Sequence, residues 1–382
     1  MRKRVLLIPD GMADNRLDEL DGRTPIEVAA TPNLDAVAAV THGLVQTVPA
    51  GMVPGSDVAN LAMLGYDPAS MYTGRSPLEA ASIGVELGPR DVAYRCNLVT
   101  IQDGIMISNT ASGIGNEEAR KLIDLLQARL GDERFEFYYG LGYRHLLVWR
   151  GGEQVEFTPP HNILDQAVAG YRPQGPAADV LAALTTAANE LLAAERADTE
   201  IWLWGQGTAP RVPLFLDQRG LRGAVVAAVD LVRGIGRCAG MDVLDVPGAT
   251  GDLDTDYVSK ATVGLAALER YDFVFIHVEA PDEASHLGDL DEKIKAIEQV
   301  DREILGRLLA SPLQPAVLVA PDHYTLVKTR VHSAEPVPFA FNAVTPGAHS
   351  SAKLFSEAAA AATGLRVASG AALMDLFLAA TT

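Results

Sequence analysis

The sequence predicts an α/β protein with a mostly parallel sheet, helices on both of its faces, and a smaller inserted α+β domain. Apolar runs rich in Val, Ile and Leu recur along the chain, and segments of helical periodicity separate them. Strands that alternate with helices in this way form parallel sheets that are buried on both sides. The predicted strands are residues 5–9, 146–149, 200–204, 223–229, 273–279 and 316–320.

Three segments between these strands are predicted to be helices, because their apolar residues recur three and four positions apart. They are residues 117–130, 178–195 and 291–310.

The middle of the chain differs from both ends. Its apolar runs have hairpin-sized spacing, as in EFYYG followed by GYRHLLVWRGG, and it holds the loop-like stretches TPPHNI and YRPQGP. We therefore expect residues 91–204 to form the inserted domain. Residues 1–90 and 205–382 would together form a discontinuous core.

The composition excludes several classes of partner. The net charge is −18, so nucleic acids and anionic membrane surfaces, which are bound through basic patches, are not expected partners. Binding of a small anionic substrate would need bound divalent cations to reverse the local field. Nothing in the sequence indicates an oligomeric state.

The sequence also indicates a cytoplasmic protein. Basic residues at positions 2–4 precede the apolar run VLLIP, but Asp10 follows too soon for a secretory signal, which needs roughly 7–15 apolar residues. No stretch approaches the ~18 consecutive apolar residues of a membrane span. Two cysteines, Cys96 and Cys238, are too few for a disulfide framework.

Acidic and imidazole side chains follow several predicted strands at the point where each strand ends. Ligands bind beyond the carboxyl ends of the strands in an open parallel sheet, so these residues are candidates for a site. Two of them are four residues apart, which places them on one face of a helical turn. The candidates are Asp10, Asp282, His286, Asp322, His323 and His332.

A set of carboxylates and imidazoles suits Mn²⁺ or Zn²⁺. Six such groups exceed the needs of one catalytic ion with an open position, so they indicate two ions. Each residue alone has a structural alternative. Asp10 could cap a helix, His286 could be a surface residue and His332 a hydrogen-bonded loop histidine.

Ser56 is the candidate nucleophile. It follows Pro54 and Gly55 at the predicted start of a helix, where its hydroxyl would lie in the positive field of the helix amides. The alternative is a plain N-cap serine, although the residue three positions on is Ala59 and cannot complete a capping box. A metal-bound serine beside backbone donors is suited to phosphoryl transfer. No GxxxxGK[ST] motif supports ATP binding.

Nearly the whole chain resembles one family, the cofactor-independent phosphoglycerate mutases of the archaeal type, which belong to the alkaline phosphatase superfamily. The resemblance lies in LLIPDGMAD, TPNLDAVA, GMVPGSDVANLAMLGYDP, YTGRSPLEA, DVAYRCNLVTI, GAVVAAVDLVRGIG, VPGATGDLDTDY, HVEAPDEASHLGD, KIKAIEQVDREI and the PDHYT to VHSAEPVPF stretch. It implies a phosphatase-like core that binds two ions, Mn²⁺ first, with Zn²⁺, Co²⁺ or Mg²⁺ as alternatives. The second domain would close over a small phosphorylated substrate.

The resemblance also implies a role for each candidate. Asp282, His286 and His332 would hold one ion. Asp10, Asp322, His323 and the Ser56 oxygen would hold the other. Ser56 would take the phosphoryl group from 3-phosphoglycerate and return it to the 2-hydroxyl of the glycerate.

Departures from the family pattern concern the substrate. The segment ISNTASGIGNEEA lacks the two arginines usual there, and a common lysine is replaced by Arg233. In YRHLLVWRGG, TPPHNIL and IWLWGQG the chain is similar to a bacterial subgroup proposed to act as homoserine kinases. The remaining candidates for substrate binding are Arg75, Arg95, Arg144, His145 and Arg233.

Three hypotheses follow. The first is a two-metal phosphoglycerate mutase that works through a phosphoserine. The second is a kinase-like phosphotransferase that acts on homoserine or another small alcohol. The third is a metal-stabilised protein without catalytic activity.

Overall fold

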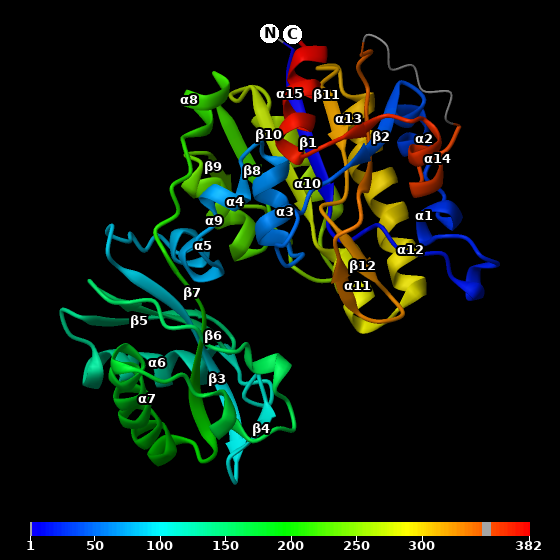
Figure 1. Ribbon diagram of the computed structural model, residues 1–382. Coiled ribbons are helices and arrows are strands. Elements are labelled where there is room, and N and C mark those ends of the chain that lie inside the picture. The colour runs from blue at the N-terminus through cyan, green and yellow to red at the C-terminus, as the bar shows by residue number, and fades with distance from the viewer. Residues whose placement is uncertain (1, 346–352) are drawn as a thin grey trace. The chain divides into compact units, whose positions relative to one another are not determined.

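The computed structural model describes residues 2–345 and 353–382 and divides into two compact units (Figure 1). The first unit comprises Met1–Tyr72 and Val212–Thr382, and the second comprises Thr73–Arg211. Each is described by itself below.

The first unit contains an eight-stranded sheet in the order β15-β2-β14-β11-β1-β10-β8-β9. Strand β1 lies between β10 and β11 and is parallel to both, and β8 and β9 continue the parallel part. Only β14 runs antiparallel to its neighbours β11 and β2. The strands are β1 (Arg4–Pro9), β2 (Thr41–Val45), β8 (Gly223–Val226), β9 (Asp242–Leu244), β10 (Phe273–Val278), β11 (Ala316–Val319), β14 (Val337–Phe341) and β15 (Arg366–Val367).

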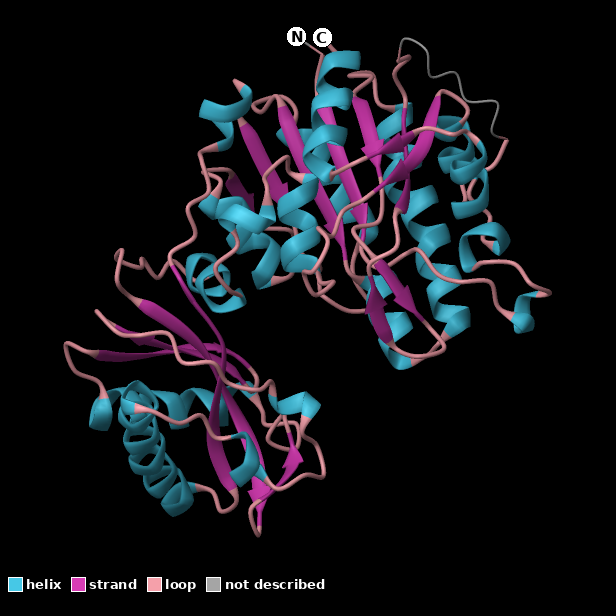
Figure 2. Cartoon of the chain, in the orientation of Figure 1, coloured by secondary structure: helices cyan, strands magenta, loops and turns pink. Residues whose placement is uncertain are grey.

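Helices cover both faces of this sheet, as predicted (Figures 1 and 2). On one face Gly264 of α10 packs against Ile276, and on the other Gly236 of α9 packs against Val225. Both glycines lie so close to the sheet that an added Cβ atom would clash with these side chains. The helices of this unit are α1 (Pro25–Val28), α2 (Pro32–Ala38), α3 (Ser56–Met63), α4 (Pro68–Met71), α8 (Phe215–Arg219), α9 (Asp230–Cys238), α10 (Tyr257–Ala267), α11 (Ala280–Leu287), α12 (Leu290–Gln299), α13 (Gly306–Ala310), α14 (Glu357–Ala362) and α15 (Gly370–Ala380), with a 3₁₀ turn η1 (Asp18–Leu20).

The predicted helix 291–310 contains a π-helical segment, η4 (Val300–Leu305), between α12 and α13. Asp301 in this segment is buried and accepts hydrogen bonds from the backbone N–H groups of Asn33 and Leu34 at the start of α2. A side chain from the π segment therefore satisfies helix amides that have no partner within α2.

The second unit is an antiparallel sheet with helices. Strand β3 (Val92–Gln102) pairs with β4 (Ile105–Ser108), β6 (Arg144–Trp149) and β7 (Thr199–Thr208), and β6 also pairs with β5 (Phe135–Leu141). The predicted strands 146–149 and 200–204 thus lie in this antiparallel sheet and not in the parallel one. The helices are α5 (Arg75–Ser82), α6 (Asn116–Leu130), α7 (Pro176–Glu195), η2 (Pro160–Asn162) and η3 (Val168–Tyr171).

This unit starts earlier than the expected residue 91. Helix α5 is held on β7 because the hydroxyls of Thr73 and Ser76 donate to the carbonyls of Thr208 and Gly205, at 2.6 Å each. The expected end, residue 204, lies inside β7.

Among the described residues, one helix, α7, is long and apolar enough to cross a membrane. Its Leu181, Ala188 and Leu192 are buried in the core of the second unit. Core helices of soluble proteins can have the same length and apolar composition, so α7 is weak evidence for a membrane span.

Glu357, at the start of α14, predicts a pH dependence of stability. Its carboxylate oxygens accept from Asp14 N at 3.2 Å and from the Thr24 hydroxyl at 2.8 Å, and burial raises its pKa from 4.5 to about 7. Between these two pH values the folded protein holds a proton that the unfolded chain has released. The free energy of unfolding therefore falls as the pH rises through this window.

Glu357→Gln has no carboxyl proton to release in this window. Between pH 5 and pH 8 we therefore expect the free energy of unfolding to fall by roughly 1–3 kcal/mol less in the variant than in the wild type. Urea denaturation at several pH values measures the difference. Glu269→Gln, at an exposed carboxylate, is the matched control. Parallel pH profiles for wild type and Glu357→Gln would contradict the expectation.

Candidate metal centre

The centre lies at the carboxyl ends of the three central strands of the first unit. Strand β1 pairs with β10 as far as Pro9 and Val278, and with β11 as far as Leu7 and Val319. The residues that follow the three strands therefore meet at one edge of the sheet. Asp10 follows β1 directly, and its backbone N–H donates to Val278 O at 2.9 Å.

Asp282 and His286 lie one turn apart on α11, which begins directly after β10. Burial alone would raise the pKa of Asp282, but its contacts with His286 and His332 lower it well below the usual value. The same carboxylate raises the pKa of His286 to about 8. Asp282 Oδ2 is 3.2 Å from His286 Nε2, and Asp282 Oδ1 is 3.4 Å from His332 Nε2.

A short hairpin brings the last two histidines to this position. Strands β12 (Tyr324–Leu326) and β13 (Val331–Ser333) pair so that Thr325 is opposite His332. His323 directly precedes β12, and its ring stacks on that of His332 with centroids 4.0 Å apart. His332 Nε2 is also 2.8 Å from His286 Nε2. The fold thus brings together three imidazoles that are separated in the sequence.

The ligand atoms predicted from the sequence gather in two groups at this edge. Those of Asp282, His323 and His332 lie within 4.8 Å of one another, and those of Asp10, Asp322 and His323 do the same. His323 belongs to both groups, whereas the resemblance assigned it to the second alone. His286 contacts the first group through Asp282 and His332.

The electrostatics of the second group fit a bound cation. Asp10 is 1% exposed, and its Oδ1 has no hydrogen-bond partner among the described residues. Burial raises the pKa of Asp10 well above its usual value, and the charges of Asp322, Asp282 and Glu279 raise it further. Buried carboxylates that repel one another are stabilised when a divalent cation lies between them.

Ser56 lies beside this group. It is the first residue of α3, and Gly55 occupies the N-cap position, so the N-cap alternative for the serine is wrong. Ser56 Oγ donates to Asp10 Oδ2 at 3.2 Å and lies 3.2 Å from His323 Nε2. Asn60 Nδ2 donates both to Ser56 O and to Asp322 Oδ2, which ties α3 to the end of β11. No helix starts at Asp10 either, so its proposed cap role is also wrong.

Two residues at the centre were not predicted from the sequence. His277, in β10, and Glu279, directly after it, form a third group of potential ligands with Asp10. The signal was present in FVFIHVE, where a polar side chain interrupts a buried strand as Asp10 ends another.

Three of the candidates for substrate binding are arginines of the second unit. The guanidinium carbons of Arg95 and Arg75 lie 4.9 and 5.9 Å from the centre of the Trp204 ring. Burial lowers the pKa of Arg95, Glu79 raises it, and the charges of Arg75 and Arg144 lower it again. The charges of Arg75 and Arg144 therefore both act on Arg95, which pairs with Glu79 at 2.7 Å.

The other two candidates have different environments. His145 is buried, and burial lowers its pKa to about 3, so at neutral pH the ring has no charge with which to bind an anion. Arg233 lies on α9 in the first unit, where it lines a cavity of about 310 Å³ and pairs with Asp245 at 3.0 Å.

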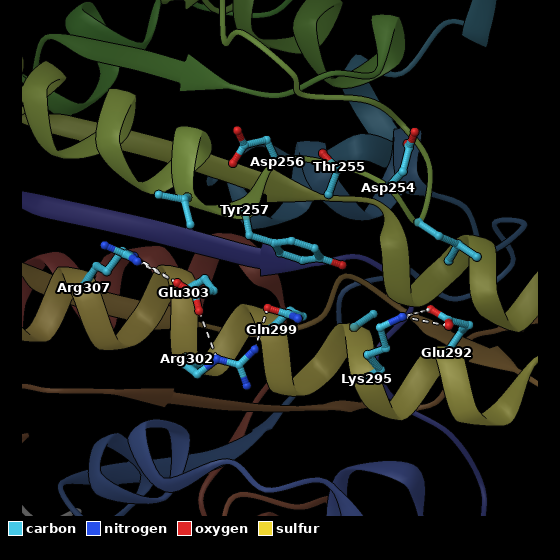
Figure 3. A pocket seen from close by; sticks show the side chains of 13 residues that line it. Asp254, Thr255, Asp256, Tyr257, Glu292, Lys295, Gln299, Arg302, Glu303 and Arg307 are labelled. Carbon is cyan, nitrogen blue, oxygen red and sulfur yellow. Dashed lines mark hydrogen bonds and ion pairs between the residues drawn. The ribbon is translucent and has the colours of Figure 1, made fainter.

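A larger cavity of about 590 Å³ lies between α10 and the α12–α13 helix (Figure 3). Five of its charged side chains pair with one another: Glu303 with Arg302 and Arg307, and Lys295 with Glu292. None of its lining residues belongs to the ligand groups described above. This cavity is therefore not part of the centre.

Comparisons with known proteins agree on one family. The profile of the family described as 2,3-bisphosphoglycerate-independent phosphoglycerate mutase matches residues 38–198. A probable enzyme of this name from Geobacter sulfurreducens is 44% identical over 98% of this chain and 99% of its own length. A second, from Methanothermobacter thermautotrophicus, is 49% identical over 88% of this chain and 87% of its own.

Two solved structures are similar over the full length of the chain. A protein from Pyrococcus horikoshii has a TM-score of 0.84 and 29% identity, and the match covers 100% of this chain and 97% of that one. A cofactor-independent phosphoglycerate mutase from Thermoplasma acidophilum has a TM-score of 0.68 and 26% identity, with 100% of both chains covered.

Metal removal is expected to destabilise the protein. Without cations the buried carboxylates at the strand ends repel one another, so chelator-treated protein should unfold several degrees below the protein supplied with Mn²⁺. Differential scanning calorimetry measures the shift. Asp322→Asn should reduce it, whereas Glu303→Gln in the larger cavity should leave it unchanged. Equal melting temperatures with and without metal would refute the site.

Proposed function

The chain belongs to the family of 2,3-bisphosphoglycerate-independent phosphoglycerate mutases, and from this premise we propose that it interconverts 3-phosphoglycerate and 2-phosphoglycerate through a phosphoserine at Ser56. One observation carries the proposal. The Ser56 hydroxyl lies 3.2 Å from both Asp10 and His323, at the N-terminus of a helix and at the strand edge where the acidic groups meet. The segments YRHLLVWRGG, TPPHNIL and IWLWGQG are the support for a kinase of homoserine, whereas the relatives described above are named as phosphoglycerate mutases.

We propose two ion sites from the groups described above. Asp282, His286 and His332 would hold one ion, and Asp10, Asp322, His323 and Ser56 Oγ the other. Carboxylate and imidazole ligands suit Mn²⁺, with Zn²⁺, Co²⁺ and Mg²⁺ as alternatives. When bound, the ions neutralise charge on the transferred phosphoryl group and lower the pKa of the serine hydroxyl.

The protein's own groups orient the nucleophile. Contacts with Asp10 and His323 hold the Ser56 oxygen at the start of α3, where the helix amides favour negative charge. Ser56 Oγ attacks the phosphorus of 3-phosphoglycerate, a new O–P bond forms, and the bond from phosphorus to the C3 oxygen breaks. The 2-hydroxyl of the glycerate then attacks the phosphoserine, so that a bond from phosphorus to the C2 oxygen forms and the bond from phosphorus to Ser56 Oγ breaks. Each transfer releases one proton and takes up one, so the isomerisation is balanced.

The second unit supplies a positive region suited to the substrate's anionic groups. The guanidinium groups of Arg75 and Arg95 both lie over the ring of Trp204. The ring of His161 also contacts Trp204, and the centroids of these two rings are 5.3 Å apart. Burial and the charges of these two arginines lower the pKa of His161. Like charges held together in a protein of net charge −18 favour a bound anion. We propose that Arg75 and Arg95 bind the carboxylate or phosphate of phosphoglycerate, with Arg144 nearby.

The cytoplasmic location expected from the sequence is part of the proposal. Its support is the presence of free thiols at Cys96 and Cys238.

Ser56→Ala should abolish the formation of 2-phosphoglycerate from 3-phosphoglycerate, a loss of at least about 10³-fold in kcat, because no nucleophile remains. An enolase-coupled assay with Mn²⁺ measures the rate, and Ser70→Ala on the exposed part of α4 is the control. Wild-type protein that consumes ATP with homoserine and leaves 3-phosphoglycerate unchanged would instead support the kinase hypothesis.

Arg95→Gln and Arg75→Gln should each raise the KM for 3-phosphoglycerate by roughly 10-fold or more, because each removes a charge-assisted hydrogen bond to the substrate. Steady-state kinetics give KM and kcat separately. Arg90→Gln, at an exposed arginine of the same unit, should change neither. If the KM values of all three variants equal that of the wild type, these arginines do not bind substrate.

A further inference from the structure

His277 occupies a position that an apolar residue would normally fill. It lies in the fully buried strand β10, opposite Ile8 of β1, and it is 0% exposed. Neighbouring residues of β10 alternate between the two faces of the sheet, and Val274 and Ile276 pack on the α10 side. The His277 ring lies on the opposite side, 6.0 Å from the ring of Phe275. Burial of an imidazole here needs polar partners to offset its desolvation.

Both ring nitrogens of His277 face carboxylates. Nδ1 is 2.8 Å from Glu279 Oε2, and Nε2 is 3.3 Å from Asp10 Oδ2. The same Asp10 oxygen accepts the hydrogen bond from Ser56 Oγ. A continuous row of contacts thus runs from Glu279 through His277 and Asp10 to Ser56. The side chain of Glu279 is buried, and Glu279 is 6% exposed.

The row leaves one Asp10 oxygen for the ion. Oδ2 faces His277 and Ser56, whereas Oδ1 has no hydrogen-bond partner among the described residues and lies 3.5 Å from His323 Nε2. We propose that His277, held by Glu279, is a positioning residue that orients the Asp10 carboxylate so that Oδ1 points at the cation. This inference rests on the proposed role of Asp10 as a metal ligand.

Lys260 supports the same row from the other side of the sheet. Its ammonium group is buried and donates to the backbone carbonyl of His277 at 3.0 Å. Burial lowers the pKa of Lys260 to about 8, while the charge of Glu279 raises it. The backbone of His277 is therefore anchored by Lys260 while its ring faces Asp10.

A different use of the same residues is a third cation held by Asp10, His277 and Glu279, whose ligand atoms lie within 4.8 Å of one another. Neither ring nitrogen has an aligned hydrogen bond among the described residues. However, the two carboxylates face opposite nitrogens of one ring, and a single ion can bind only one of these nitrogens. The geometry therefore favours a row of partners over a third ion.

The test measures Mn²⁺ binding to metal-stripped protein by isothermal titration and by the electron paramagnetic resonance signal of free Mn²⁺. Wild-type protein should bind two ions. In His277→Leu one site should keep its affinity and the other should weaken roughly 10- to 100-fold, as is usual when a partner of a metal ligand is lost. His277→Gln, which keeps a donor for Asp10, should recover most of the affinity.

His42→Leu is the matched control. His42 is also a buried imidazole on a strand of this sheet, but it stacks on Phe355 and has no carboxylate contact among the described residues. Its substitution should leave both Mn²⁺ affinities unchanged. Glu279→Gln is nearly isosteric and tests the same row if His277→Leu does not fold. We expect about 10-fold weaker binding at one site.

Two results would overturn the inference. Unchanged Mn²⁺ affinity at both sites in folded His277→Leu and in Glu279→Gln would show that His277 and Glu279 do not orient the Asp10 carboxylate. Three ions bound to wild type, with one lost in His277→Leu, would assign a third cation site. Both results are independent of the proposed function, which fails instead if wild type with two bound Mn²⁺ does not convert 3-phosphoglycerate.

Discussion

The parallel pairing of β1 with β10 and β11 is the constraint on which the candidate centre depends. Because the three strands run in the same direction, their carboxyl ends meet, and the residues after them share one edge of the sheet. Asp10, Asp282 and Asp322 follow the carboxyl ends of these three strands. A change in the direction of any one strand would carry its carboxylate to the opposite edge. The site therefore follows from topology before any side chain is placed.

Because these carboxylates are close together and buried, they repel one another, and this repulsion changes their pKa values. Burial and mutual repulsion raise the pKa of Asp10, while three nearby imidazoles keep Asp282 ionised. Cations at this edge would reduce the repulsion, and their ligands would then orient one another. Helix α3 adds Ser56 to the group because Asn60, one turn later, is hydrogen-bonded to Asp322. In the second unit, Arg75, Arg95 and His161 lie around the ring of Trp204.

Much of this could be predicted from local patterns. Continuous apolar runs followed by acidic residues predicted the strands β1, β10 and β11 and the groups at their ends. Pairing between distant segments could not be predicted from these local patterns. Residues 146–149 and 200–204 have the same apolar character as the parallel strands, yet β3 pairs with both of their strands in the antiparallel direction. The N-cap alternative for Ser56 was wrong because Gly55 takes that position.

The sequence by itself determined the residue types and their order: strands ending in carboxylates, a serine at a helix start, and a histidine four positions after Asp282. These are local features, because strand and helix periodicity depend on neighbouring residues. Only the tertiary structure decided which groups meet. The β12–β13 hairpin brings His332 into contact with Asp282. His323 belongs to both ligand groups, and His277 lies between Glu279 and Asp10. Contacts of this kind join residues that are far apart in the chain or on separate strands, so no periodicity in the sequence records them.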